Sequence, residues 1–160
     1  MRKTQGSKPQ SLKGRRVLVE QMIYYNEMER GQMPAVIGLL QKISDFNPEP
    51  TTYDRIWADY SQQGHVFPIV AHLADGFVLG FGALLIERKI RGGSLGHIED
   101  VATHHEFRGK GIGLTLMSKL TDIARERGCY KVALHCRKHN VSFYENCGFE
   151  ASGTSMQKIL

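Results

Sequence analysis

One stretch, residues 99–113, constrains the fold of this sequence more than any other. Residues 99–103 alternate in character and include β-branched side chains, which predicts the end of a strand. Residues 108–113 read Arg-Gly-Lys-Gly-Ile-Gly, a glycine-rich turn, and Leu116, Leu120 and Ile123 follow at helical spacing. Glycines let backbone N–H groups approach an anion, and a helix N-terminus adds free donors and a positive dipole end. The stretch therefore predicts a phosphate site, and an ordinary strand-to-helix turn is the alternative.

Two familiar phosphate loops do not match this turn. A Walker A loop ends in Lys-Ser or Lys-Thr, and neither dipeptide follows Gly111 or Gly113. The dinucleotide fingerprint needs a third glycine where this chain has Leu114, and it belongs to a βαβ unit near the start of a domain. The sequence therefore indicates a different kind of phosphate loop.

Length and charge indicate one globular domain. The 160 residues suit a single core, expected over residues 14–160. Residues 1–13 are expected to form a disordered basic leader, and a nucleic-acid-binding arm is the alternative. No apolar run reaches the roughly 20 residues of a membrane span, and the N-terminus lacks the apolar core of a signal peptide. We therefore expect neither nucleic acid nor membrane as a partner.

The cysteines bear on location and metal binding. They are three in number and lack Cys-x-x-Cys spacing, which predicts reduced thiols and a cytoplasmic protein. Cys136, His139 and His135 resemble only part of a metal site, so we expect no metal. The chain ends in Lys-Ile-Leu, which is close to a peroxisomal Ser-Lys-Leu signal, so a peroxisome-type organelle is the alternative location.

The remaining pattern predicts strands interleaved with helices. Strands are expected at residues 17–25, 66–74, 77–89, 95–103, 130–136 and 149–159, with Asp75 and Gly76 as a hairpin turn. Gly80 and Gly82 suggest a bend or a close approach within their strand. Helices are expected from residue 34, at 53–62 behind a Thr52 cap, at 111–127, and from 139 or 140 to 146. This order predicts an α/β domain with a mixed, mostly antiparallel sheet flanked by helices.

Residues 108–113 resemble the Arg/Gln-x-x-Gly-x-Gly/Ala pyrophosphate loop of the GCN5-related N-acetyltransferases (GNATs). Further segments are similar to one branch of that superfamily, the glucosamine-6-phosphate N-acetyltransferases. They lie at residues 86–90, 96–101, 128–132, 140–144 and 147–149, whereas residues 1–60 match only in outline. The resemblance implies the acyl-CoA N-acyltransferase fold and acetyl-CoA as co-substrate.

The same resemblance implies an activity. It is acetyl transfer from acetyl-CoA to the 2-amino group of D-glucosamine 6-phosphate, a step toward UDP-N-acetylglucosamine, in a homodimer with a shared substrate site. No cysteine lies within the motif, so we expect direct transfer in a ternary complex. The rivals are a GNAT acting on a protein N-terminus, polyamine or aminoglycoside, and a non-catalytic acyl-CoA-binding module.

The resemblance also assigns residues to the cofactor. The pantetheine arm is expected where the strand splays from its neighbour, along Val101, Ala102 and Thr103. The pyrophosphate is expected at Arg108, Gly109, Lys110, Gly111, Ile112 and Gly113. Tyr144 is the candidate acid, because a phenol of pKa about 10 can protonate a thiolate whose conjugate acid has pKa about 8.5; a core aromatic is the alternative. Phe143 and Asn140 are expected beside the CoA arm, although Asn140 could simply cap its helix.

Glu99, Asp100 and His135 complete the candidate catalytic residues. By resemblance, the two acids hold the sugar, and Glu99 or a nearby backbone carbonyl orients its amine; a surface ion pair is the alternative. They are not expected to work as a carboxylate pair, because successive strand residues face opposite sides. His135 stands where relatives carry an acid; it is a candidate base or orienter, and a space-filling histidine is equally compatible. Other substrate contacts are expected from Val101, Tyr130 and the candidate phosphate-binding cations Lys89, Arg91, Lys131 and Lys158.

Overall fold

The structure, a computed structural model, describes residues 22–160. Within them, a five-stranded sheet runs in the order β1-β2-β3-β4-β5. Its strands are β1 (Tyr24–Glu27), β2 (Val66–His72), β3 (Val78–Arg88), β4 (Ser94–Thr103) and β5 (Cys129–Leu134). The first four strands pair antiparallel, and β5 joins β4 in parallel. The predicted mixed, mostly antiparallel sheet is therefore confirmed.

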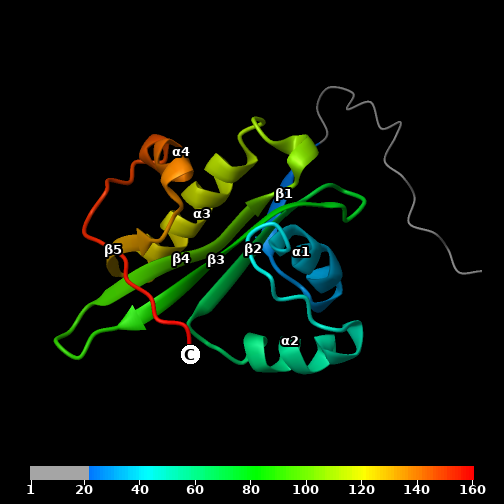
Figure 1. Cartoon of the computed structure of the whole chain (residues 1–160), viewed down its shortest axis with the longest axis horizontal. Coiled ribbons are helices and arrows are strands. Elements are labelled where there is room, and N and C mark those ends of the chain that lie inside the picture. The colour runs from blue at the N-terminus through cyan, green and yellow to red at the C-terminus, as the bar shows by residue number, and fades with distance from the viewer. Residues whose placement is uncertain (1–21) are drawn as a thin grey trace, which may run out of the picture.

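Helices cover both faces of this sheet (Figure 1). They are α1 (Met33–Leu40), α2 (Tyr53–Ser61), α3 (Ile112–Glu126) and α4 (Val141–Asn146). On one face, α3 buries Leu116 against a cluster that contains Ile98 and extends to α4. On the other face, Leu39 of α1 packs with Phe81, and α2 adds partly buried side chains. None of these helices is long and apolar enough to cross a membrane.

The long helix α3 forms where the sequence predicts it. Its buried residues recur every third or fourth position, so one stripe faces the sheet. The glycines of β3 let the helix approach closely, because a Cβ at Gly80 would lie 3.0 Å from Leu116 Cδ1. A Cβ at Gly82 would lie 3.0 Å from Leu120 Cδ1. The predicted close approach is confirmed, and it seats the start of α3 beside the end of β4.

The predicted hairpin between β2 and β3 is also confirmed. Gly76 has φ +83, a conformation that favours glycine, and its N–H donates to Leu73 O at 2.9 Å. The Asp75 carboxylate accepts a hydrogen bond from the Phe77 N–H at 3.0 Å. Asp75 and Gly76 therefore supply the turn chemistry that the sequence indicates.

Both terminal strands differ from expectation. The first strand begins at Tyr24, and residues 17–21 of its predicted range, like the basic leader at 1–13, lie outside the described residues. The strand expected at residues 149–159 is wrong, since no strand follows α4 in the described chain. Local β propensity needs a pairing partner to become a strand, and within residues 22–160 β5 pairs with β4 alone. Residues 150–160 are instead exposed.

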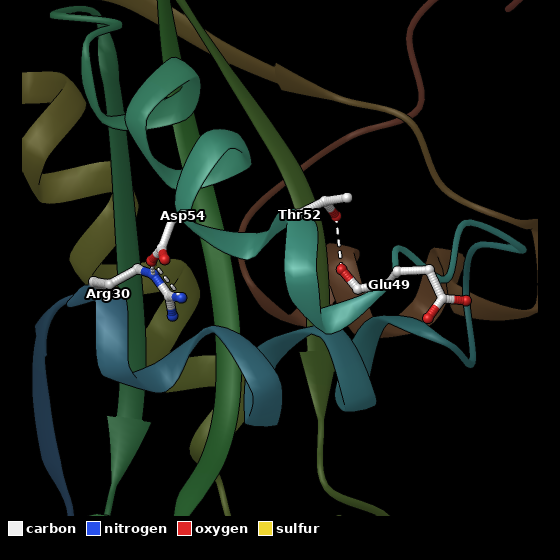
Figure 2. A network of polar contacts seen from close by, with 4 residues as sticks. All are labelled: Arg30, Glu49, Thr52 and Asp54. Atoms are coloured by element: carbon white, nitrogen blue, oxygen red, sulfur yellow. Dashed lines mark hydrogen bonds and ion pairs between the residues drawn. The ribbon is translucent and has the colours of Figure 1, made fainter.

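Thr52 occupies the N-cap position of α2, as predicted, but its side chain does not cap the helix. Its hydroxyl donates instead to Glu49 O at 2.7 Å across a 3-10 turn, Pro50–Thr52 (Figure 2). Figure 2 also shows Arg30, just before α1, against Asp54 in the first turn of α2; Arg30 Nη2 lies 2.7 Å from Asp54 Oδ1. This ion pair joins the turn that precedes α1 to the first turn of α2.

Candidate functional site

A cavity of about 800 Å3 opens where the end of β4 meets the start of α3. The end of α1, the loop after β5 and α4 complete its walls. The cavity collects many of the sequence-predicted site residues: Glu99, Asp100, Val101, Ala102, Thr103, Arg108, Gly109, Gly111, Ile112, Gly113, His135, Asn140, Phe143 and Tyr144. Lys110 is not part of its lining; its Nζ lies 4.9 Å from the centre of the Phe107 ring.

A β-bulge at Asp100 shapes the cavity. Ala102 pairs with Phe81 and Glu99 with Ala83, so two residues of β4 face Gly82 alone. Asp100 has φ +56, the one positive φ at a non-glycine position among residues 22–160. The bulge breaks the alternation of the strand, and Glu99 and Asp100 line the cavity together with every other residue from 98 to 103. That the two carboxylates face opposite sides stays a prediction. Desolvation raises the pKa of the Asp100 carboxyl.

Beyond the bulge, β4 separates from β5. Their pairing runs from Ser94 with Cys129 to Ile98 with Leu134, whereas β4 continues to Thr103. Within the described chain, the β5-side edge of residues 99–103 therefore has no strand partner. Backbone N–H and C=O groups on such an edge are free to hydrogen-bond an extended ligand that carries amides. The predicted splay near Val101 is confirmed.

The glycine turn has the geometry of an anion cradle. Gly109 and Gly111 have φ +75 and +77, which side-chain-bearing residues rarely adopt. Gly111 is the N-cap of α3 and no side chain caps this end, so the first N–H groups of the helix remain available. A Cβ at Gly113 would lie 3.1 Å from Phe143 Cζ, so the lack of a side chain keeps α4 close. These residues fit a diphosphate held mainly by main-chain donors.

Tyr144 lines the cavity from α4 and is half-buried. Its ring meets Phe143 edge-on, with centroids 5.0 Å apart. Burial raises the pKa of Tyr144, and Cys136 and Cys147 raise it further. The phenol therefore keeps its proton at neutral pH and can donate it to a group in the cavity.

Asn140 and His135 lie on the loop side of the cavity. Asn140 is the N-cap residue of α4, yet its side chain makes no capping hydrogen bond, so the simple capping interpretation is wrong. His135 is exposed and lines both this cavity and a second one of about 890 Å3. An exposed imidazole is not a space-filling core residue, so that interpretation of His135 is also wrong.

The second cavity runs along β5 and the C-terminal segment. Tyr130 and Lys131 line it, and it shares His135, Cys136 and Tyr144 with the first cavity. Tyr130 and Lys131, two of the predicted substrate contacts, therefore line the second cavity and not the first.

The other candidate phosphate-binding cations lie elsewhere. Lys89 Nζ is 2.6 Å from Glu87 Oε2, and His97 Nε2 is 2.9 Å from the same oxygen. Hydrogen bonds from Lys89 and His97 lower the pKa of the Glu87 carboxyl. Arg91 and Lys158 line neither cavity. A single chain therefore does not bring Lys89, Arg91, Lys131 and Lys158 together.

One lysine and one arginine that the sequence motifs did not assign to the site also line the first cavity. Lys42 follows α1, and Arg137 lies in the loop after β5; both are exposed and line the first cavity. Burial lowers the pKa of His104, and the charge of Lys42 contributes to that shift. A signal for Arg137 did exist, because it opens the basic run Arg-Lys-His at 137–139. Lys42 carries no local signal, since only the fold brings α1 to the end of β4.

Comparison with known proteins places this geometry in a family. Residues 33–149 match the model of the acetyltransferase (GNAT) family. The chain is 42% identical over 91 residues to glucosamine 6-phosphate N-acetyltransferase from Candida albicans, a match covering 56% of this chain and 61% of that protein. It is 34% identical over 127 residues to glucosamine 6-phosphate N-acetyltransferase 1 from Oryza sativa subsp. japonica, covering 75% of this chain and 76% of that protein.

A solved structure agrees with these matches. The chain superposes on the crystal structure of glucosamine-6-phosphate N-acetyltransferase from Arabidopsis thaliana with a TM-score of 0.81 and 29% identity. That alignment covers 86% of this chain and 98% of the plant protein, so the fold is shared across nearly its whole length.

Proposed function

Since the chain belongs to the acetyltransferase (GNAT) family and, within it, to the glucosamine 6-phosphate N-acetyltransferases, we propose that it acetylates the 2-amino group of D-glucosamine 6-phosphate from acetyl-CoA. One observation carries the proposal: the glycine turn, the β4 bulge and Tyr144 meet in one cavity. A thioester held along the turn would lie there beside Glu99 and Asp100, whose carboxylates can orient a hexosamine. The product would enter UDP-N-acetylglucosamine biosynthesis, and the free thiols of the three cysteines support a cytoplasmic location.

Several features support acetyl-CoA as the donor. The uncapped start of α3 and the left-handed glycines suit the diphosphate. The open edge of residues 99–103 suits the amides of the pantetheine arm, and the uncommitted Asn140 amide lies on the opposite wall. A main-chain N–H on that edge would polarise the thioester carbonyl.

Direct transfer needs a proton donor and a proton acceptor. The amine nitrogen attacks the thioester carbon, so a C–N bond forms and the C–S bond breaks. Tyr144, whose pKa is raised chiefly by burial, gives its proton to the departing sulfur. His135 accepts the proton that the amine loses, while Glu99 and Asp100 hold the amine in position. Water then carries the proton from His135 to Tyr144, which restores both groups.

A homodimer would complete the acceptor site. The second cavity lies beside β5, and the C-terminal residues Met156, Ile159 and Leu160 are exposed. Phosphate-binding cations are dispersed in one chain, so a second copy would supply those that the first cavity lacks. Light scattering on the eluting peak of a sizing column tests this, and a monomer that retains full activity would rule it out.

A thiol-release assay tests the activity itself. Acetyl-CoA would be mixed with D-glucosamine 6-phosphate, D-glucosamine, a peptide N-terminus, a polyamine and an aminoglycoside. We expect rapid release with glucosamine 6-phosphate and far slower release with glucosamine. Equal rates with and without the 6-phosphate, or preference for another amine, would refute the proposed acceptor. No release with any amine would leave a non-catalytic acyl-CoA-binding module.

A further inference from the structure

Three cations from separate segments border the first cavity: Lys42 after α1, Arg108 in the glycine turn and Arg137 after β5. None of them forms an ion pair within residues 22–160, where the pairs join other side chains. Glu99 and Asp100 also line the cavity, and they too form no ion pair with the described residues. Within residues 22–160, these three positive charges therefore have no ion-pair partner, although Glu99 and Asp100 line the same cavity.

Like charges around a concave surface repel one another, and an anion bound among them relieves that repulsion. Lys42 follows α1 and lines the cavity together with Thr103 at the end of β4 and Phe107 just before the glycine turn. Arg137 approaches the cavity from the other strand, beyond the point where β4 and β5 separate. The three cations thus come from different walls around one opening.

We propose that Lys42 and Arg137 form a second phosphate subsite, which binds the 3′-phosphate of coenzyme A. This inference rests on the proposed function. Coenzyme A carries a diphosphate and, on the adjoining ribose, a separate phosphate monoester. The glycine turn and Arg108 account for the diphosphate, which leaves two uncompensated cations for the monoester. The guanidinium of Arg137 can hold two phosphate oxygens at once, while Lys42 supplies a point charge.

The acceptor sugar also carries a phosphate monoester, so the two sources must be separated. The acetyl group must lie at the bulge, beside Glu99 and Asp100, if it is to meet the amine. An extended coenzyme A then places its nucleotide end near the cavity opening, where the exposed Lys42 and Arg137 lie. The carboxylates at the bulge would repel a sugar phosphate held close to them. The observations therefore favour the cofactor's monoester.

Calorimetric titration without acceptor tests the subsite. The wild-type protein, Lys42→Gln, Arg137→Gln and the double variant would each be titrated with coenzyme A and with 3′-dephospho-coenzyme A. We expect the wild type to prefer coenzyme A roughly 10-fold or more, since charge-assisted hydrogen bonds to exposed groups discriminate by about that factor. Each single variant should weaken coenzyme A binding about 3- to 10-fold and leave the dephospho form unchanged. The double variant should bind both alike.

Arg55→Gln is the matched control, because Arg55 is exposed on α2 and lines neither cavity. It removes one positive charge and should change neither affinity. The inference would be overturned if Lys42→Gln and Arg137→Gln weaken the binding of coenzyme A and of 3′-dephospho-coenzyme A equally, or if they weaken neither. A raised KM for glucosamine 6-phosphate, but not for glucosamine, with unchanged coenzyme A affinity would overturn it as well. Wild-type protein that binds no coenzyme A would instead refute the proposed function.

Discussion

Replacing Gly111 with alanine changes the backbone preference at the start of α3 without creating a contact. Gly111 has φ +77, and a Cβ built there meets no heavy atom within 4 Å. Holding an L-residue in the left-handed region costs about 1–2 kcal/mol, so Gly111→Ala should lower the free energy of unfolding by about that much. For a domain of this size, the loss corresponds to a Tm lower by about 2–8 °C.

Urea unfolding followed by circular dichroism measures the stability, and calorimetry measures coenzyme A binding. If φ relaxes to a negative value, the N–H groups of the turn point away from the diphosphate, so affinity should fall as well. Gly111→Asn should recover part of both losses, because asparagine tolerates the left-handed region.

The matched control is Gly38→Ala in the middle of α1, where a Cβ also meets nothing within 4 Å and φ is not positive. This helical position should gain roughly 0.5–1 kcal/mol of stability. Unchanged stability in Gly111→Ala, or equal losses in Gly111→Ala and Gly111→Asn, would refute the reasoning.

Three further changes probe the acid, the core and a titrating phenol. Tyr144→Phe should lower kcat roughly 10²- to 10⁴-fold, with coenzyme A affinity unchanged. Because burial raises the pKa of Tyr144 above 10.0, the wild-type rate should persist to alkaline pH and fall only as the phenol ionises; a rate–pH profile without that fall in the wild type would contradict the acid role. Leu116→Ala should lower the free energy of unfolding by about 2–5 kcal/mol in urea titration, because Leu116 is 0% exposed. Burial, with a smaller contribution from Asp100, raises the pKa of Tyr60 to about 12. The folded state therefore keeps a proton that the unfolded state loses above pH 10, and stability should fall from about pH 10 to 12; in Tyr60→Phe the Tm should fall less steeply over that range.

The local elements of the fold could be predicted because their signals lie within a few residues. Asp75 and Gly76 supply their own turn chemistry, and the stripe through Leu116 and Leu120 specifies both the helix and its buried face. The strand expected at residues 149–159 failed for a non-local reason. Its residues favour extended structure, but within residues 22–160 they pair with no strand, although the outer edge of β5 is open.

In the candidate site, too, some residues could be predicted from local sequence, whereas others depend on how the chain folds. Residues 108–113 carry the anion cradle in their own backbone preferences, so the sequence is sufficient to find them. The bulge at Asp100 depends on how β4 registers against β3, and the alternation of the sequence hides it. Lys42 and Arg137 are far apart in the chain, and only the packing of α1 beside β4 and the divergence of β5 bring them to one cavity.

Because the pairing of β5 with β4 ends at Ile98, residues 99–103 have one strand edge that is unpaired within the described part of the chain. A ligand that contains amide groups can pair with this edge as an additional strand would. Its binding there then depends on main-chain hydrogen bonds more than on the identity of the side chains. Amide protons of residues 99–103 that point to the open β5 side should exchange with water faster in the free protein than in the ligand complex. The end of β4 would then be more mobile in the free protein, and the bound ligand would make it rigid.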